Sequence, residues 1–253
     1  MRKKIKILAH ITGWLVLLAA IIVTFAFSYT ETATVECSEI VIQYDEDQAV
    51  RLGRQEIIRL VNVADNQVIG KRFREINSEV IEREVEKHNT IEKADAFKLI
   101  IRDTTGYRGV LSIKVKYRDP LLRVISSQGS FYLDKYGHRF PTSIYYSSNV
   151  LVASGNVSED FAREQLLPLA GFIAEDDFWK AQIRQVHVNG HEELVLTPLV
   201  GDQLIEFGSA GDFREKFRNL MAFYEQVLSN SNWNKYERIS VKYKNQVIGK
   251  KSD

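Results

Sequence analysis

The chain has 253 residues, with 34 basic and 33 acidic side chains that give a formal net charge of +1 at pH 7. A near-neutral chain lacks the basic excess that a polyanion attracts, so nucleic acid is not an expected partner. Cys37 is the single cysteine, which excludes an internal disulfide framework and leaves stability to the hydrophobic core. The length suits one large domain or two small ones.

A predominantly apolar run covers residues 5–27, with Lys6 and His10 as its ionisable residues. As a helix it is about 35 Å long, slightly more than the ~30 Å hydrocarbon core of a bilayer. Four of the first six residues are basic, which keeps the N-terminus cytoplasmic. The sequence therefore predicts a cytoplasmic segment over 1–6, a transmembrane helix over 7–28 and an exported remainder. A cleaved signal peptide is the alternative, although this run is longer than the usual signal sequence.

The first exported part alternates short strands and helices. We expect a strand over 38–44, helices over 54–62 and 77–88, and strands over 96–102 and 110–117. Asn77 is a good helix N-cap, flanked by apolar Ile76 and Ile81. The order predicts a three-stranded sheet with both helices on one face, an α+β domain over 36–118. The Pro120 region breaks the pattern, and a second domain is expected over 119–250, with a tail over 251–253.

The second part is richer in strands. A helix capped by Ser158 is expected to stop at Pro168, and the last helix is expected to begin with a capping box of Asp212 and Glu215. Asn189-Gly190 predicts a two-residue hairpin turn. Together these signals predict a mostly antiparallel β domain with helices and an exposed C-terminal edge strand. Its expected strands cover 121–126, 130–134, 150–152, 186–188, 191–196, 203–207 and 238–250, and its further helices cover 176–183 and 212–228.

Signals for catalysis are weak throughout the chain. Asp134, His138 and Ser143 contain the residue types of a catalytic triad, but no nucleophile elbow or oxyanion-hole glycine pattern accompanies them. His187 and His191 are four residues apart, but a hairpin staggers them and pairs His187 with Glu192 across the strands. We therefore expect no catalytic, cofactor or metal site and no enzymatic activity.

The final strand is the best candidate for a binding site. A strand at a sheet edge leaves backbone groups unpaired, and these can accept a strand from another chain. Its lysines have an alternative reading as guards against aggregation. The candidate partner-binding residues are Arg238, Ile239, Ser240, Val241, Lys242, Tyr243, Lys244 and Val247.

Motifs spread over nearly the whole chain resemble the cell-division family FtsQ, also called DivIB, in its Bacteroidetes-type form. The strand–helix–helix–strand–strand order is likewise that of a POTRA module. No single motif is diagnostic, but their order and spacing together are specific. They are residues 68–71, 76–77, 81–82, 88–94, 109–115, 118–124, 131–134, 137, 140–141, 196–201, 205–208 and 236–243.

The resemblance implies a non-enzymatic, single-pass divisome scaffold in the bacterial inner membrane, with its bulk in the periplasm at the division septum. The POTRA domain would help recruit it, and the β domain would bind partners of the FtsB and FtsL type, linking early assembly to the septal peptidoglycan synthase. In the family FtsB adds a strand to the last β-domain strand, which here corresponds to 238–247, with Tyr243 at the matching aromatic position. The alternative is another membrane-tethered POTRA protein, an accessory in envelope assembly or secretion.

Overall fold

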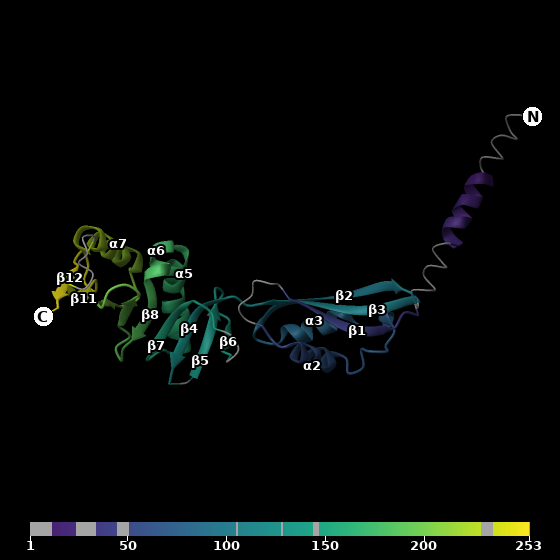
Figure 1. Ribbon diagram of the computed structural model, residues 1–253, viewed down its shortest axis with the longest axis horizontal. Helices are drawn as coiled ribbons and strands as arrows, with labels where there is room; N and C mark the ends of the chain where they lie inside the picture. The colour runs from purple at the N-terminus through teal and green to yellow at the C-terminus, as the bar shows by residue number, and fades with distance from the viewer. Residues whose placement is uncertain are drawn as a thin grey trace, which may run out of the picture. The chain divides into compact units, whose positions relative to one another are not determined.

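The computed structural model describes residues 12–23, 34–44, 51–104, 106–127, 129–143, 147–228 and 235–252. By contacts the chain divides into two compact units (Figure 1). The first unit comprises Met1–Glu46 and Leu52–Lys116, and the second comprises Asp47–Arg51 and Tyr117–Asp253.

Residues 12–23 form a helix whose side chains are all exposed. Within the described part of the chain, no helix is both long enough and apolar enough to cross a membrane. The remainder of the span predicted over 7–28 lies outside the described residues.

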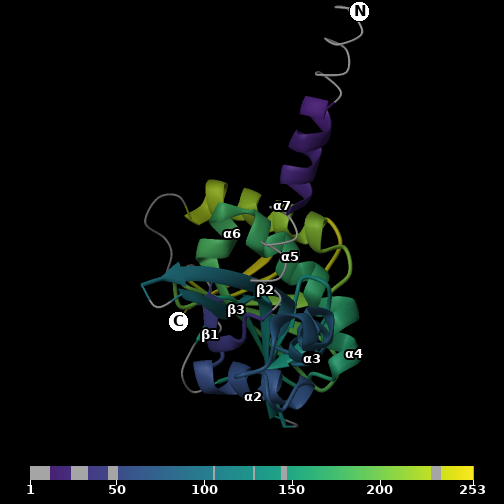
Figure 2. The ribbon, with the colours of Figure 1, turned by 90° about the vertical axis from the view of Figure 1, so that its right-hand side faces the viewer.

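The first unit contains a three-stranded sheet of order β1-β3-β2, in which β1 runs parallel to β3. Helices α2 and α3 lie on the same face of this sheet (Figures 1 and 2). The predicted strand–helix–helix–strand–strand order is confirmed. The elements are β1 (Cys37–Tyr44), α2 (Arg54–Ala64), the 3₁₀ turn η1 (Phe73–Glu75), α3 (Ser78–Glu86), β2 (Ile91–Asp103) and β3 (Gly106–Tyr117).

Helix α3 begins where its sequence predicts. The side chain of Asn77 accepts a hydrogen bond from the backbone N–H of Val80, at 3.3 Å, which satisfies one of the free donors of the first turn. Ile81 and Val85 are fully buried on the inner face of this helix, and the helix packs against β2. Strand β2 begins at Ile91, earlier than predicted. The prediction missed this start because the charged residues at 92 and 93 interrupt the apolar alternation in the sequence.

The second unit is built on a nine-stranded sheet of order β12-β11-β10-β9-β8-β7-β4-β5-β6. Parallel pairing occurs between β10 and β11, β4 and β7, and β7 and β8, and the other neighbouring strands are antiparallel. The strands are β4 (Pro120–Ser126), β5 (Gly129–Asp134), β6 (Arg139–Pro141), β7 (Leu151–Gly155), β8 (Ile183–Val188), β9 (Leu194–Pro198), β10 (Leu204–Gly208), β11 (Tyr236–Ser240) and β12 (Ile248–Lys251).

Helices cover one face of this sheet, where α5, α6 and α7 lie side by side (Figures 1 and 2). Between helices and strands lies one continuous hydrophobic core, to which β4, β8, β9 and β10 contribute their inward-facing side chains. An aromatic group at its centre joins Trp179 and Phe217, whose ring centroids are 4.7 Å apart. The helical segments are α4 (Glu159–Phe161), η2 (Ala162–Leu166), α5 (Leu167–Glu175), α6 (Asp177–Gln182), α7 (Phe213–Phe223) and η3 (Tyr224–Leu228).

The helix that starts at Ser158 does not end at Pro168, contrary to prediction. Ser158 caps it as expected, accepting from the N–H of Phe161 at 3.1 Å. The chain then makes the π-helical turn η2, and Pro168 falls in the first turn of α5. A proline is tolerated there because the first-turn N–H groups have no intrahelical acceptor.

The capping box predicted at the start of the last helix is also wrong. Asp212 has φ +52°, in the left-handed region, and its side chain makes no capping hydrogen bond. Its backbone carbonyl instead accepts from the N–H groups of Glu215 and Lys216. The buried positions Phe217 and Leu220 still follow the predicted apolar stripe.

Candidate partner-binding edge

The single strand predicted over 238–250 is two strands in the structure. Strand β11 ends at Ser240, and β12 begins at Ile248 after a connection over 241–247 in which Asn245 has φ +56°. Strand β12 returns antiparallel to β11, pairing Ser240 with Ile248 and Arg238 with Lys250. Alternation in sequence marked extended segments but not the reversal between them.

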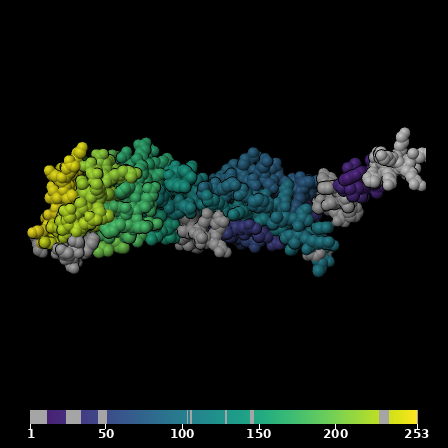
Figure 3. All heavy atoms as spheres, turned by 90° about the horizontal axis from the view of Figure 1, so that it is seen from above, coloured from purple at the N-terminus to yellow at the C-terminus, as the bar shows by residue number. Residues whose placement is uncertain are grey.

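Strand β11 is therefore an inner strand, since β10 pairs with one side of it and β12 with the other. The open edge of the second unit at this end is β12, and the C-terminal residues lie on the surface of that unit (Figure 3). Arg238, Ile239 and Ser240, predicted as edge residues, belong to β11. Their backbone cannot accept a further strand while β12 is in place.

The rest of the predicted binding residues lie in the connection. Val241 is 2% exposed, and its N–H donates to the carbonyl of Glu206 at 3.0 Å, so it belongs to the core and to the ladder. Lys242, Tyr243 and Lys244 are exposed, and Tyr243 has 56% of its surface in solvent. Val247 is half-buried against the core and holds the start of β12 in place.

Packing fixes the position of β12 itself. Gly249 lies against the ring of Tyr236, so closely that a Cβ atom at residue 249 would meet a ring carbon at 2.6 Å. The Tyr236 ring in turn contacts the ring of Phe223 on α7, with centroids 5.3 Å apart. Ile248, next to the glycine, is 50% exposed and available for contact. The edge thus combines a fixed backbone with an exposed apolar side chain.

Ion pairs join the last strands to their neighbours. Arg238 contacts Glu206 on β10 at 2.9 Å, and Lys250 contacts Glu237 on β11 at 2.9 Å. The hydrogen bond from Lys250 is the main reason why the pKa of Glu237 lies below its ordinary value. Each pair is exposed and adds little to stability, and each joins side chains of neighbouring strands whose register the backbone ladder defines.

The connection before β12 is also tied to a more distant loop. Lys242 forms an ion pair with Glu193, in the connection between β8 and β9. This hydrogen bond is the leading cause that lowers the pKa of Glu193 and raises the pKa of Lys242, so both groups stay charged near neutral pH.

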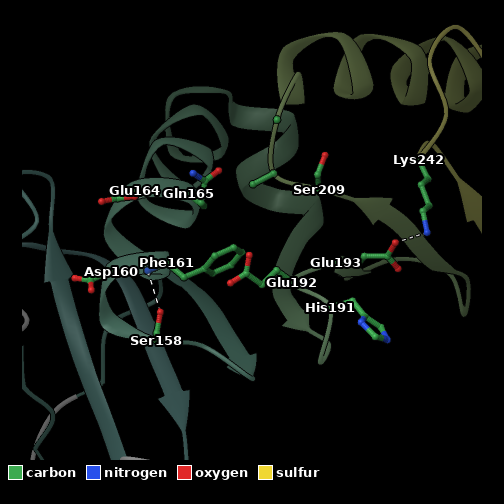
Figure 4. Close-up of a pocket in the computed structure, with 12 residues that line it drawn as sticks. Ser158, Asp160, Phe161, Glu164, Gln165, His191, Glu192, Glu193, Ser209 and Lys242 are labelled. Atoms are coloured by element: carbon green, nitrogen blue, oxygen red, sulfur yellow. Dashed lines mark hydrogen bonds and ion pairs between the residues drawn. The ribbon is translucent and has the colours of Figure 1, made fainter.

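Beside this ion pair lies a surface hollow of about 750 Å³. Phe161 from α4 and Glu192 from the β8–β9 connection extend toward each other across it, while Lys242 reaches Glu193 at its rim (Figure 4). Asp160 and Glu164 add two more carboxylates to its wall. The hollow is acidic and adjoins the connection that leads into β12.

The β8–β9 connection differs from the predicted two-residue turn. It covers 189–193, and the side chain of Asn189 accepts from the N–H groups of His191 and Glu193 at 2.9 and 3.0 Å. These bonds favour a longer loop, in which Glu192 has φ +58°. His187 consequently faces Val195 and not Glu192, and its Nδ1 lies 3.2 Å from the Oγ of Ser154.

Asp134 and His138 do come together, but in a turn. Both oxygens of Asp134 are occupied: Oδ1 accepts from the N–H groups of Tyr136 and His138, and Oδ2 lies 3.0 Å from Arg118 Nη1 and 3.0 Å from His138 Nδ1. The carboxylate is 5% exposed. Such an arrangement holds the β5–β6 turn closed.

Several contacts determine the ionisation of Asp134. Burial is the largest single influence and raises its pKa, but the hydrogen bonds from the His138 backbone, Arg118, the His138 ring and the Tyr136 backbone together outweigh it. The pKa of Asp134 is therefore lowered from its ordinary value. Its contribution to stability is present above the unfolded-state pKa and is lost as the pH falls through the folded-state pKa.

We expect Asp134→Asn to destabilise the second unit by about 1–3 kcal/mol at pH 7, because Arg118 loses its charged partner and one oxygen no longer accepts. The deficit should shrink as the pH falls below the unfolded-state pKa of about 3.9, because the wild-type protein then progressively loses the stabilisation that its ionised carboxylate provides. Urea unfolding at pH 7 and pH 3 measures both values. Asp160→Asn, at an exposed position, is the matched control and should change stability by less than about 0.5 kcal/mol. A deficit equal at both pH values would contradict this role of the charge.

Sequence reasoning missed the four residues Ile248–Lys251 as a separate edge strand. The signals that could have found it were Asn245, a residue type that tolerates positive φ, and Gly249, which permits close packing. Among the residues that the structure describes, no group of three or more His, Cys, Asp or Glu side chains is arranged to hold a metal ion.

Comparison with known proteins agrees with these two folds. A POTRA-like domain matches residues 35–100, which include β1, α2, α3 and most of β2. The family described as FtsQ/DivIB, C-terminal related, matches residues 119–250, slightly more than half of the chain. The chain therefore belongs to the FtsQ/DivIB family. It is 27% identical over 196 residues to the cell division protein FtsQ of Salinibacter ruber, covering 71% of each chain.

Proposed function

We propose that this protein is a non-enzymatic, membrane-anchored scaffold of the divisome. Membership of the FtsQ/DivIB family supports a scaffold role in cell division and interaction with other division proteins. The proposed arrangement is a cytoplasmic segment over 1–6, a transmembrane helix over 7–28, a POTRA domain over 36–118 and a β domain over 119–250. The bulk of the protein would then lie in the periplasm at the division septum.

The observation that carries the proposal is the open edge of β12. Within the described part of the chain, the sheet order pairs β12 with β11 alone, so one row of its backbone donors and acceptors faces outward. An extended segment of a partner can complete this row by strand addition. We propose a partner of the FtsB type as that strand, with an FtsL-type protein in the same complex, through which the scaffold acts on the septal peptidoglycan synthase.

Residues around the edge have different tasks in this proposal. Ile248–Lys251 supply the backbone, while Tyr243 and Ile248, both at least half exposed, supply apolar contacts. Lys242 and Lys244 lie on the adjoining connection. Arg238, Ile239 and Ser240 act indirectly, because β11 holds β12 in register.

A fluorescent fusion to the full-length chain, imaged in dividing cells of the native host, tests the division role. We expect a band at mid-cell that appears before constriction. The same fusion lacking residues 248–251 should still reach mid-cell if the POTRA domain recruits it, but it should fail to support division. Uniform labelling of the envelope would contradict the proposal and favour the alternative accessory role in envelope assembly or secretion.

A further inference from the structure

One end of the first unit carries an unusual concentration of exposed apolar side chains. Strands β2 and β3 extend past the part of the sheet that the helices cover (Figure 1), and we call residues 97–104 and 106–108 the β2–β3 arm. Ala94 and Ala96, just before the arm, are buried, whereas every arm residue whose burial is described is exposed. The large exposed side chains are Phe97 (49%), Leu99 (42%), Ile100 (40%), Ile101 (40%) and Tyr107 (48%).

These side chains occupy both faces of the arm. Strand alternation places Phe97, Leu99 and Ile101 on one face and Ile100 on the other, with Arg102. Arg102 lies over the ring of Tyr107, 5.8 Å from its centroid, which puts Tyr107 on that second face. A protein docked on a sheet needs one apolar face. Apolar residues on both faces of the arm fit an environment that surrounds the arm, such as the interfacial layer of a bilayer.

The arm lies where the chain enters this unit from its N-terminal side. Gly109, at the base of the arm, pairs with Cys37 at the start of β1, and its N–H donates to the carbonyl of Glu36 at 3.2 Å. A Cβ atom at residue 109 would meet that carbonyl oxygen at 2.5 Å, so the two segments are in close contact. Because β1 is parallel to β3, the residues before Cys37 continue in the direction of the arm.

Chain length limits how far the arm can be from the proposed membrane anchor. The described helix ends at Val23, and the described part of the first unit begins at Thr34. Ten residues lie between them, and even fully extended they span at most about 40 Å. An anchor in the bilayer therefore keeps the base of the arm near the membrane surface.

The charge of the arm also fits a lipid surface. The arm contains Lys98, Arg102, Arg108 and Asp103, which together give a net charge of +2. Lys98 donates to the carbonyl of Ile76 and Arg108 lies 4.0 Å from Glu39, so Arg102, over the ring of Tyr107, is the basic group best placed to meet a headgroup. Basic side chains beside apolar ones are typical of segments that bind anionic lipid headgroups.

Strand β2 is also an edge of its sheet. Before the arm, Glu86 and Glu82 on α3 accept from the backbone N–H groups of Ala94 and Ala96. Among the residues that the structure describes, no strand pairs with the outer backbone groups of the arm itself. These groups need polar partners, which restricts insertion to the headgroup layer.

We propose that the β2–β3 arm inserts its apolar side chains into the headgroup layer of the anionic membrane that anchors the chain. The arm would act as a second point of attachment and would restrict the rotation of the first unit about its tether. This inference rests on the proposed membrane anchor and adds a lipid-binding surface to it.

The test uses the full-length chain reconstituted into vesicles of phosphatidylcholine with 30% phosphatidylglycerol. Leu99→Cys carries an environment-sensitive fluorophore, and a lipid-borne quencher reports its contact with the bilayer. Lys87→Cys, exposed at the opposite end of β2 from the arm, is the matched control. Cys37 is fully buried, and burial raises the pKa of its thiol, so the native cysteine should remain unlabelled.

We expect quenching at position 99 to exceed that at position 87 by roughly threefold or more, and to weaken in vesicles without the anionic lipid. Equal quenching at the two positions, in protein that floats with the vesicles after alkaline washing, would overturn the arm proposal and leave the anchor intact. Loss of protein from the floating fraction would remove the anchor and the arm proposal together. If the fluorophore at position 99 became buried only when a partner protein was added, the arm would be a binding site for that protein, which would contradict lipid binding.

Discussion

Lys251→Pro is expected to weaken binding of an FtsB-type partner by at least about tenfold while leaving the fold intact. The N–H of Ser252 donates to the carbonyl of Lys235 at 3.0 Å, so residue 252 faces β11. Alternation along a strand then directs the N–H of Lys251 outward, to the open edge. Proline removes that donor and places its ring where the partner backbone would lie, and the loss of one backbone hydrogen bond alone is about 1 kcal/mol.

The matched control is Lys251→Ala, which removes the charge but keeps the N–H. We expect its affinity, measured by titration calorimetry with the purified partner, to remain within about threefold of the wild type. Val241→Pro is a poorer probe than Lys251→Pro, because the N–H of Val241 donates to the carbonyl of Glu206 and its side chain is buried. Equal affinities for the proline variant and the wild type would exclude strand addition at β12.

Phe217→Ala should cause the largest loss of stability, about 3–5 kcal/mol for the second unit. Phe217 is 1% exposed, and its ring centroid lies 4.7 Å from that of Trp179 and 5.2 Å from those of Phe172 and Phe207. Truncation leaves a cavity between α5, α6, α7 and β10 and removes aromatic contacts worth about 0.5–1.5 kcal/mol each.

Urea unfolding followed by tryptophan fluorescence and far-ultraviolet circular dichroism measures this change. Leu199→Ala, at a position that is 60% exposed, is the control and should stay within about 0.5 kcal/mol of the wild type. A loss below about 1 kcal/mol for Phe217→Ala would show that α7 is not held by this aromatic group.

Local patterns were sufficient for the first unit. The Asn77 cap, the helical spacing of Ile81 and Val85 and the alternation in β3 depend on neighbours in sequence, and each predicted element is present. The start of β2 was not predictable in the same way. Ile91 is buried by packing against α3, and the charged residues that follow it give no sign of a strand in the sequence.

The second unit departs from prediction where a side chain within a loop forms hydrogen bonds with the backbone of that loop. Asn189 accepts two N–H groups and so lengthens the β8–β9 connection, which no count of apolar residues reveals. At Pro168 the π-helical turn η2 lets the helical segment continue. Pairing between distant strands, such as β4 with β7, is set by the whole core and leaves no local signal.

The candidate site shows the same division. Alternation predicted an extended segment near the end of the sequence. It did not predict that a separate strand, β12, forms the edge and leaves β11 inside the sheet. The edge position of β12 depends on the turn at Asn245 and on the packing of Gly249 against the ring of Tyr236. Apolar periodicity in the sequence indicates neither a backbone turn nor a close approach of a glycine to an aromatic ring.

The two edges of the nine-stranded sheet are unequal. At one edge lies β6, three residues long and ending in Pro141, whose nitrogen has no hydrogen to offer a further strand. At the other edge lies β12, which contains no proline. Strand addition is therefore favoured at β12 over β6. A complex formed by strand addition should contain one partner strand per chain, and copies of the sheet should not join end to end into fibres.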